Sequence, residues 1–465
     1  MERKGLSSNR LRVRRSLSRR DFLRLGGTGL AGMALLGTAA CGDGGGDQGG
    51  GATNIVFSFG PDRSGTLQQL VDRFNQQHEG EIQATYQQMS RVTDEYFRTL
   101  VSEFQAGSPE IDVIGGDVIW GAEFAANGWI EDLSRRLYRD YELEVPDAFL
   151  KAPMNTVSYQ NKLWGVPWFT DVGLLFYRKD LLDEAGLGQA PATWSGLKDI
   201  ANQVTAETGT QHGFVFPGAE YEGGVVNGAE YIWNAGGSIL TGNITVQSGG
   251  TPIIVTPNFI TINDRDSVEG LRAERATITD NVAPKAVASY REKQCYEAFL
   301  KGDAVFMRNW PSAYGLAEED FSNVSQGQIG IAALPVKEEG MQSWSCLGGW
   351  NMYINRASDK TDAAWEFIKF MTAPEQQKFR ALEGSFLPTL RSLYDDREIL
   401  DNAPVIDLGR EIIAENARSR PVTPFYSTMS SRMANKFNAS LKGETDPEQA
   451  VSELQTELEN VVKQN

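Results

Sequence analysis

Short apolar segments alternate with helical segments along the first part of this chain. An apolar run at residues 54–59 ends at Gly60-Pro61, and apolar residues then recur at helical spacing from 67 to 74. The alternation continues with a strand, a helix and a buried strand at residues 81–87, 95–105 and 111–114. Strands that are separated by helices pair in parallel, so this order predicts an α/β fold built on a parallel sheet.

Ligands of such sheets bind beyond the carboxyl ends of the strands. In this chain those ends are followed by loops at residues 60–65, 88–93 and 115–120. These loops are therefore the first candidate binding surface, and Asp117 lies in one of them.

A second α/β region follows residue 165. An apolar strand is expected over residues 172–178, directly after Asp171. Further helices are expected near 194–204, 230, 294–300, 362–371 and 447–462, with strands at 212–216 and 304–307. About 410 residues remain beyond the N-terminal segments, which exceeds one typical hydrophobic core, so we expect two lobes.

The N-terminal segment has the pattern of an export signal. Residues 18–24 carry a twin-arginine signature, and residues 25–40 form a weakly apolar run, shorter than the roughly 20 residues of a transmembrane helix. Small residues precede Cys41, which is typical of a lipoprotein whose cysteine carries the lipid; the alternative is an ordinary cysteine after a cleaved secretion signal. We expect a signal at 1–40 and a Gly-rich tether at 41–53.

Charge and cysteine content narrow the class of protein. The full chain has a formal net charge of −17, and residues 1–40 carry nine basic but only two acidic side chains, so the mature chain reaches −24. Such a surface repels nucleic acid and anionic lipid, and it favours a neutral or cationic ligand.

The cysteine count predicts one possible disulfide. With Cys41 as an anchor, Cys295 and Cys346 remain. We predict one disulfide between them, with two free buried thiols as the alternative.

The sequence offers little support for an enzyme. The mature chain has two histidines, His78 and His212, and it contains no HExxH, P-loop, GxSxG or CxxC motif, so we expect no metal and no cofactor. A glycoside hydrolase that uses two of Asp117, Asp171 and Glu222 as acid and base remains as the enzymatic alternative.

Several stretches resemble extracellular solute-binding proteins of sugar ABC importers, closest to the trehalose/maltose-binding group. They occur in the same order as in that family, at residues 163–182, 221–223, 302–311, 347–350 and 420–426. The resemblance covers residues 54–463 and implies two α/β lobes, with a ligand cleft between them that closes by hinge motion. It implies an N-lobe at 54–168 plus 350–398 and a C-lobe at 169–349 plus 399–465, joined by three crossings near Pro167, Gly349 and Ile399.

The resemblance also implies a set of cleft residues. These are Asp117, Phe169, Asp171, Tyr221, Glu222, Trp310, Gly349, Trp350 and Arg420. Two further candidates come from their positions. Asp62 lies in the loop where the family places a sugar-binding acid slightly later, with Arg63 as the other possible substitute; Arg98 lies on a helix near the loop at 88–93, with a plain surface arginine as the alternative. Ionised carboxylates accept hydrogen bonds from sugar hydroxyls, an arginine donates several, and aromatic rings cover the apolar faces of a pyranose. Local structural roles stay open: Asp117 as a helix cap, Asp171 as a turn residue and Glu222 as a solvated loop charge.

The expected function follows from this resemblance. The chain would be a monomeric receptor outside the cytoplasm, held to the membrane only by its lipid, that delivers a neutral disaccharide or small oligosaccharide to an ABC permease. The loop at 60–65 and Ser312 depart from the family pattern, so the sugar is a trehalose- or maltose-like glucoside only by analogy. The alternative ligand is another oligosaccharide or a polyol-type compound; an anionic one is disfavoured, because three acids face one arginine.

Overall fold

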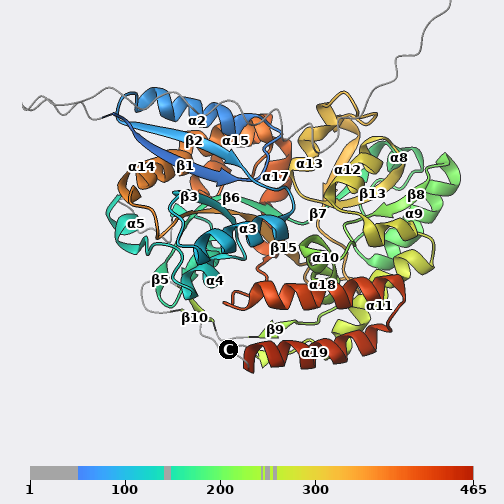
Figure 1. Ribbon diagram of the computed structural model, residues 1–465. Coiled ribbons are helices and arrows are strands. Elements are labelled where there is room, and N and C mark those ends of the chain that lie inside the picture. Colours follow the sequence, from blue (N-terminus) through green and yellow to red (C-terminus); the bar gives the residue numbers. More distant parts are fainter. Residues whose placement is uncertain (1–50, 141–147, 242–243, 247–251, 255–258, 464–465) are drawn as a thin grey trace, which may run out of the picture. The chain divides into compact units, whose positions relative to one another are not determined.

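The computed structural model describes residues 51–465 apart from residues 141–147, 242–243, 247–251, 255–258 and 464–465 (Figure 1). The predicted signal, Cys41 and most of the tether therefore lie outside the described residues. Among the described helices, none is both long enough and apolar enough to cross a membrane.

The first sheet begins with the predicted alternation of strands and helices. Strands β1 (Thr53–Phe59), β2 (Ile82–Gln88) and β3 (Val113–Asp117) pair in parallel, with β1 in the middle. Helices α2 (Thr66–Gln77) and α3 (Thr93–Gln105) connect them. The α/β alternation predicted for residues 54–117 is thus confirmed (Figure 1).

Three strands from later parts of the chain extend this sheet. Strand β15 (Ser345–Ile354) runs antiparallel to β3, and β6 (Val166–Val172) and β16 (Ala417–Arg418) both pair with β15. The sheet is therefore mixed rather than purely parallel. Segments that lie up to 300 residues apart in sequence meet on β15, which places their side chains next to one another.

A second, four-stranded sheet has the order β14-β7-β13-β8. Its strands are β14 (Ile329–Ala332), β7 (Leu174–Arg178), β13 (Ala304–Asn309) and β8 (His212–Val215). Only β13 and β8 are parallel; β7 runs antiparallel to both of its neighbours. The predicted strands at 212–216 and 304–307 are confirmed here.

Helices cover both sheets. They include α4 (Gly121–Ala126), α5 (Ser134–Asp140), α7 (Lys151–Thr156), α8 (Lys179–Glu184), α9 (Trp194–Thr208), α10 (Glu222–Asn234), α11 (Arg265–Thr279), α12 (Glu292–Leu300), α13 (Ser312–Gly315), α14 (Thr361–Thr372), α15 (Pro374–Gly384), α16 (Arg397–Asn402), α17 (Pro404–Glu411), α18 (Tyr426–Lys442) and α19 (Pro447–Lys463). The helices predicted near 194–204, 230, 294–300, 362–371 and 447–462 are confirmed. Every residue of α10 is buried, because α10 packs against α11, α18 and β15.

The single strand predicted over residues 172–178 is wrong at one point. Strand β6 ends at Val172 and β7 begins at Leu174, so the chain changes sheets at Gly173. A Cβ atom at Gly173 would lie 2.1 Å from Glu230 Oε1 and 2.5 Å from Arg308 Nη2. Glycine is thus required where the strand passes this buried ion pair.

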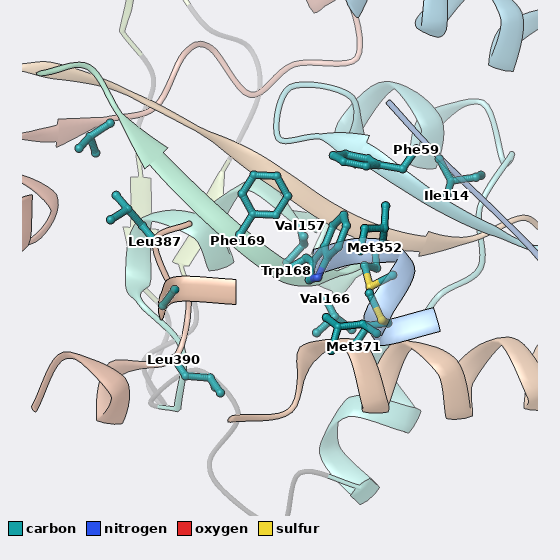
Figure 2. Close-up of a cluster of buried hydrophobic side chains, with 14 of the residues drawn as sticks. Phe59, Ile114, Val157, Val166, Trp168, Phe169, Met352, Met371, Leu387 and Leu390 are labelled. Carbon is teal, nitrogen blue, oxygen red and sulfur yellow. The ribbon is translucent and has the colours of Figure 1, made fainter. Parts of the chain in front are cut away.

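The main hydrophobic cluster surrounds the first sheet and extends to α12 and β13. Trp168 and Phe169 of β6 pack beside Phe59 of β1 and Met352 of β15 (Figure 2). The ring centroid of Trp168 lies 4.9 Å from that of Phe59 and 5.0 Å from that of Phe169. These rings support the ends of β1, β6 and β15, which is where the candidate site begins.

The predicted disulfide is wrong in this structure. Cys295 and Cys346 are both free and fully buried. Cys295 of α12 belongs to the main hydrophobic cluster, whereas Cys346 of β15 packs in a second cluster with α10, α11, α18 and α19. Burial raises the pKa of both thiols, which keeps them protonated and unreactive. The alternative of two buried thiols therefore describes the fold.

Candidate functional site

A cavity of about 400 Å³ collects almost all of the predicted site residues. Its walls include Asp117, Asp171, Tyr221, Glu222, Trp310, Gly349, Trp350 and Arg420. Some of these residues come from the first sheet, and others come from α10 and the end of β13. Of the main candidates, only Phe169 lies outside this cavity.

Strand register explains how residues from the first sheet meet. Trp350 of β15 lies opposite Asp117 of β3 on one side and Phe169 of β6 on the other. Gly348 lies opposite Asp171. The backbone at Gly349 has a φ of +119°, and a Cβ there would lie 2.5 Å from the carbonyl oxygen of Phe169, so only glycine fits. The antiparallel pairing of β15 thus brings Asp117 and Asp171 to the strands on either side of Trp350.

Arg420 is the buried centre of a charge network. Its Nη1 donates to Glu222 Oε1 at 2.5 Å, and its Nη2 donates to Asp117 Oδ1 at 3.4 Å and to the Leu347 carbonyl at 3.3 Å. Glu222 also accepts hydrogen bonds from Tyr426 Oη, at 2.8 Å, and from Ser430 Oγ. Glu222 is only 6% exposed, so its alternative interpretation as a solvated loop charge is wrong.

Asp117 keeps a local role as well. Its Oδ1 accepts the backbone N–H of Ile119 at 3.2 Å, but α4 begins later, at Gly121, so Asp117 does not cap that helix. Burial raises the pKa of Asp117 to about 6, and the opposing charge of Arg420 limits the shift. The carboxylate is therefore ionised near neutral pH and can accept further hydrogen bonds.

Asp171 has an incomplete hydrogen-bond set. Its Oδ1 is buried and has no hydrogen-bond partner among the residues that the structure describes. Burial raises its pKa to about 7; Arg380 opposes this shift, and the negative charge of Asp117 adds to it. A buried acceptor without a partner is costly, so Asp171 is suited to accept a hydrogen bond from a bound molecule.

Trp310 is held in place from behind. The guanidinium of Arg308 lies 4.2 Å from the Trp310 ring centroid, and Arg308 donates to both oxygens of Glu230, at 2.7 and 2.6 Å. A Cβ atom at Gly348 would lie 2.9 Å from the indole ring. The buried ion pair and this glycine fix the face that Trp310 presents to the cavity.

Three predicted residues lie elsewhere. Phe169 and Asp62 line a neighbouring cavity of about 410 Å³, and Arg98 lines a third one of about 450 Å³. Asp62 accepts hydrogen bonds from the backbone of Ser64 and Leu67, at 3.1 and 2.8 Å, so its carboxylate organises the loop that enters α2. The structure thus does not bring Asp62 and Arg98 to the main cavity.

Sequence reasoning missed the side of the cavity that α12 provides. Arg291, Glu292, Lys293 and Gln294 line it, and the guanidinium of Arg291 lies 4.7 Å from the Tyr221 ring centroid. The only available signal was a polar run directly before the helix predicted at 294–300. That run is indistinguishable from an ordinary exposed helix start without knowledge of the tertiary fold.

The chain has an α/β fold with two mixed β-sheets, and a cavity lined by carboxylates, an arginine and tryptophans. This is the architecture of two-lobed periplasmic binding proteins. The chain belongs to the bacterial extracellular solute-binding proteins, whose family profile matches residues 60–378. Proteins of this family serve ABC transporters as carriers and are not enzymes. The hydrolase alternative is therefore wrong.

Similarity to individual proteins supports this family assignment. A probable ABC transporter-binding protein of Deinococcus radiodurans is 30% identical over 385 residues, which cover 80% of this chain and 85% of the relative. The structure of maltose-bound MalE3 of T. maritima matches with a TM-score of 0.78 and 33% identity, over 88% of this chain and 100% of that one. A ribitol complex of a solute-binding protein from Agrobacterium radiobacter K84 has the same fold, with a TM-score of 0.74 at 23% identity, over 88% of this chain and 99% of that chain.

Proposed function

We propose that the chain is the receptor for a neutral disaccharide of the trehalose or maltose type, which it delivers to an ABC permease. The observation that carries this proposal is the buried Oδ1 of Asp171, which has no hydrogen-bond partner within the described part of the chain and lies in a cavity that also contains Trp310, Trp350 and the Arg420 network. Maltose in the similar MalE3 structure supports it. Ribitol in a more distant neighbour keeps polyols as the second candidate ligand class.

The chemistry of the cavity suits a neutral sugar. Hydroxyl groups donate to Asp117 and Asp171 and accept from Arg420, while the apolar faces of the rings stack on tryptophan. A volume of about 400 Å³ lies within the usual range for small-molecule sites, roughly 300–1,000 Å³. The predicted excess of three acids over one arginine does not hold for the whole cavity, because Arg91, Arg291 and Lys293 also line it, so charge alone does not exclude a phosphate-bearing ligand.

Contacts across the cleft support a closure mechanism. Ser427 of α18 donates its backbone N–H and its hydroxyl to Glu123 of α4, at 3.3 and 2.8 Å, and Arg420 reaches Asp117. With the lobe boundaries predicted above, both contacts join the N-lobe to the C-lobe. Sugar then shifts the protein toward the closed state by the extra contacts that it makes there, and the closed form docks on the permease.

Calorimetric titration of residues 54–465 with trehalose, maltose, sucrose, glucose and ribitol tests the ligand class. We expect saturable binding of one disaccharide and much weaker binding of glucose, because a second ring adds hydroxyl groups and apolar surface for the cavity to contact. If the protein prefers ribitol, the proposed ligand changes from a disaccharide to a polyol. No binding of any of these ligands would contradict the proposal.

We further propose export by the twin-arginine route and lipid attachment at Cys41. Replacement of Arg19 and Arg20 by lysine should leave unprocessed precursor in the cytoplasm, since the route reads the arginine pair. Immunoblots of cell fractions measure this, and Cys41→Ser should separately release the mature protein from the membrane. Normal export of the double lysine variant would contradict the twin-arginine proposal.

A further inference from the structure

A second cavity adjoins the proposed sugar cavity. It has a volume of about 410 Å³, close to that of the first, and the two share the side chains of Arg91, Asp171, Tyr296 and Trp350. Apart from these shared residues, the two walls are different. The two cavities are therefore neighbouring chambers of one cleft, separated at these four side chains.

One hydrogen bond spans the cleft at this boundary. Arg63 Nη1 donates to the hydroxyl of Tyr296 at 2.7 Å, and the guanidinium carbon lies 5.9 Å from the ring centroid. Arg63 comes from the loop after β1, in the first sheet, whereas Tyr296 belongs to α12, which packs next to β13 of the second sheet. Tyr296 lines both chambers, so this contact lies where a long ligand would pass from one to the other.

The loop that carries Arg63 is held firmly. Besides its bonds to the backbone of Ser64 and Leu67, Asp62 accepts the hydroxyl of Ser64 at 2.7 Å. Gly65, with a φ of +71°, turns the chain into α2. The local role of Asp62 is thus to fix the backbone from which Arg63 reaches across the cleft.

The second chamber has the surface chemistry of a sugar site. Phe169 and Phe386 supply apolar faces, with ring centroids 4.9 Å apart, and Arg380 stacks behind both rings. Ser312 and Glu319 add hydroxyl and carboxylate groups to the same wall. Aromatic faces combined with carboxylates and hydroxyls fit a further glucose unit, for the same reasons as in the first chamber.

We propose that the Arg63–Tyr296 contact determines ligand length: it closes the passage between the chambers, so that the protein selects a disaccharide and rejects longer oligosaccharides. The inference rests on the proposed function, because it assumes that a disaccharide occupies the first chamber. Arg63 is then a specificity-determining residue. It acts mainly by excluding a third sugar ring rather than by binding the first two.

Calorimetry with maltose, trehalose, maltotriose and maltotetraose tests this, on the wild type and on Arg63→Ala. We expect the wild type to bind a disaccharide more tightly than maltotriose. In Arg63→Ala the ratio of maltotriose affinity to disaccharide affinity should rise by about tenfold or more, with little change in disaccharide affinity. Tyr296→Phe, which keeps the ring and removes only the hydroxyl that accepts from Arg63, should change the ratio in the same direction.

Arg135→Ala is the matched control, because Arg135 is exposed on α5 and lines neither chamber. It should leave the ratio unchanged, and thermal unfolding verifies that all variants are folded. Disaccharide binding with an unchanged ratio in both Arg63→Ala and Tyr296→Phe would overturn the inference and leave the proposed function intact. Tighter binding of maltotriose by the wild type would also overturn it. A wild type that binds no disaccharide would contradict the proposed function itself.

Discussion

Replacement of Glu230 by alanine should lower the free energy of unfolding by about 3–5 kcal/mol, because it leaves the Arg308 guanidinium buried without its counter-charge. Glu230 and Arg308 are each only 1% exposed and are joined by two hydrogen bonds. Glu230 Oε1 also accepts the backbone N–H of Cys346 at 2.9 Å, which the substitution leaves unpaired. Urea unfolding followed by circular dichroism measures the change.

Two controls separate the cost of an unpaired charge from other effects. The double variant Glu230→Met, Arg308→Met removes both charges, so it should be less destabilised than Glu230→Ala. Glu448→Ala breaks the exposed pair with Arg272, and it should cost less than about 1 kcal/mol. If Glu230→Ala is as mild as Glu448→Ala, the buried pair contributes no more to stability than the exposed pair.

The same ion pair links the core to the binding site. Arg308 stacks on Trp310, and Gly173 and Gly348 have no side chain because the pair and the indole occupy that space. Glycines at these positions carry no sequence signal that distinguishes them from glycines in turns. The break between β6 and β7 was therefore missed, although the apolar residues on both sides of it were identified as strand.

The sequence predicted elements well where side-chain periodicity determines structure. The order of strands and helices from β1 to β3 follows from apolar spacing alone. The family resemblance, in turn, identified most of the residues that line the main cavity. Neither apolar spacing nor the family resemblance specifies strand register. The antiparallel pairing of β15, which sets Trp350 opposite Asp117, therefore lies outside what the sequence predicts.

Errors arose where function depends on contacts between distant segments. The cysteine count favoured a disulfide, but Cys295 and Cys346 pack in different hydrophobic clusters. The sequence predicts Asp62 as a ligand-binding residue, yet its carboxylate accepts hydrogen bonds from its own loop. Arg63, its neighbour, makes the contact across the cleft to Tyr296, and a single arginine in a loop gives no sequence sign of such a partner.

Replacement of Asp171 by asparagine should weaken sugar binding by about 10- to 100-fold. Hydrogen bonds to a charged acceptor contribute roughly 1.5–3 kcal/mol, and each 1.4 kcal/mol corresponds to a factor of ten in affinity. The side chains have almost the same shape, so the fold should remain intact. Calorimetry at pH 8, where wild-type Asp171 is ionised, measures the loss, and Asp401→Asn, an exposed change on α16, is the matched control.

The pH dependence gives a second, independent sign of the same role. Because the pKa of Asp171 is raised to about 7 in the unliganded fold, its carboxyl is partly protonated at neutral pH. Sugar hydroxyls that donate to the carboxylate favour the ionised form, so wild-type affinity should increase from pH 6 to pH 8, with release of protons on binding. Asp171→Asn cannot ionise, and this part of the increase should be absent.

The stability of the unliganded protein should change with pH in the opposite direction to its affinity for sugar. A folded-state pKa above the unfolded value gives a stabilising contribution that is complete below about pH 4 and is lost as the pH rises through about 7. Asp171→Asn removes this loss, so its stability relative to wild type should increase between pH 5 and pH 8. Identical pH profiles of affinity and of stability in the two proteins would show that Asp171 is neither buried in the way described nor bound to the ligand.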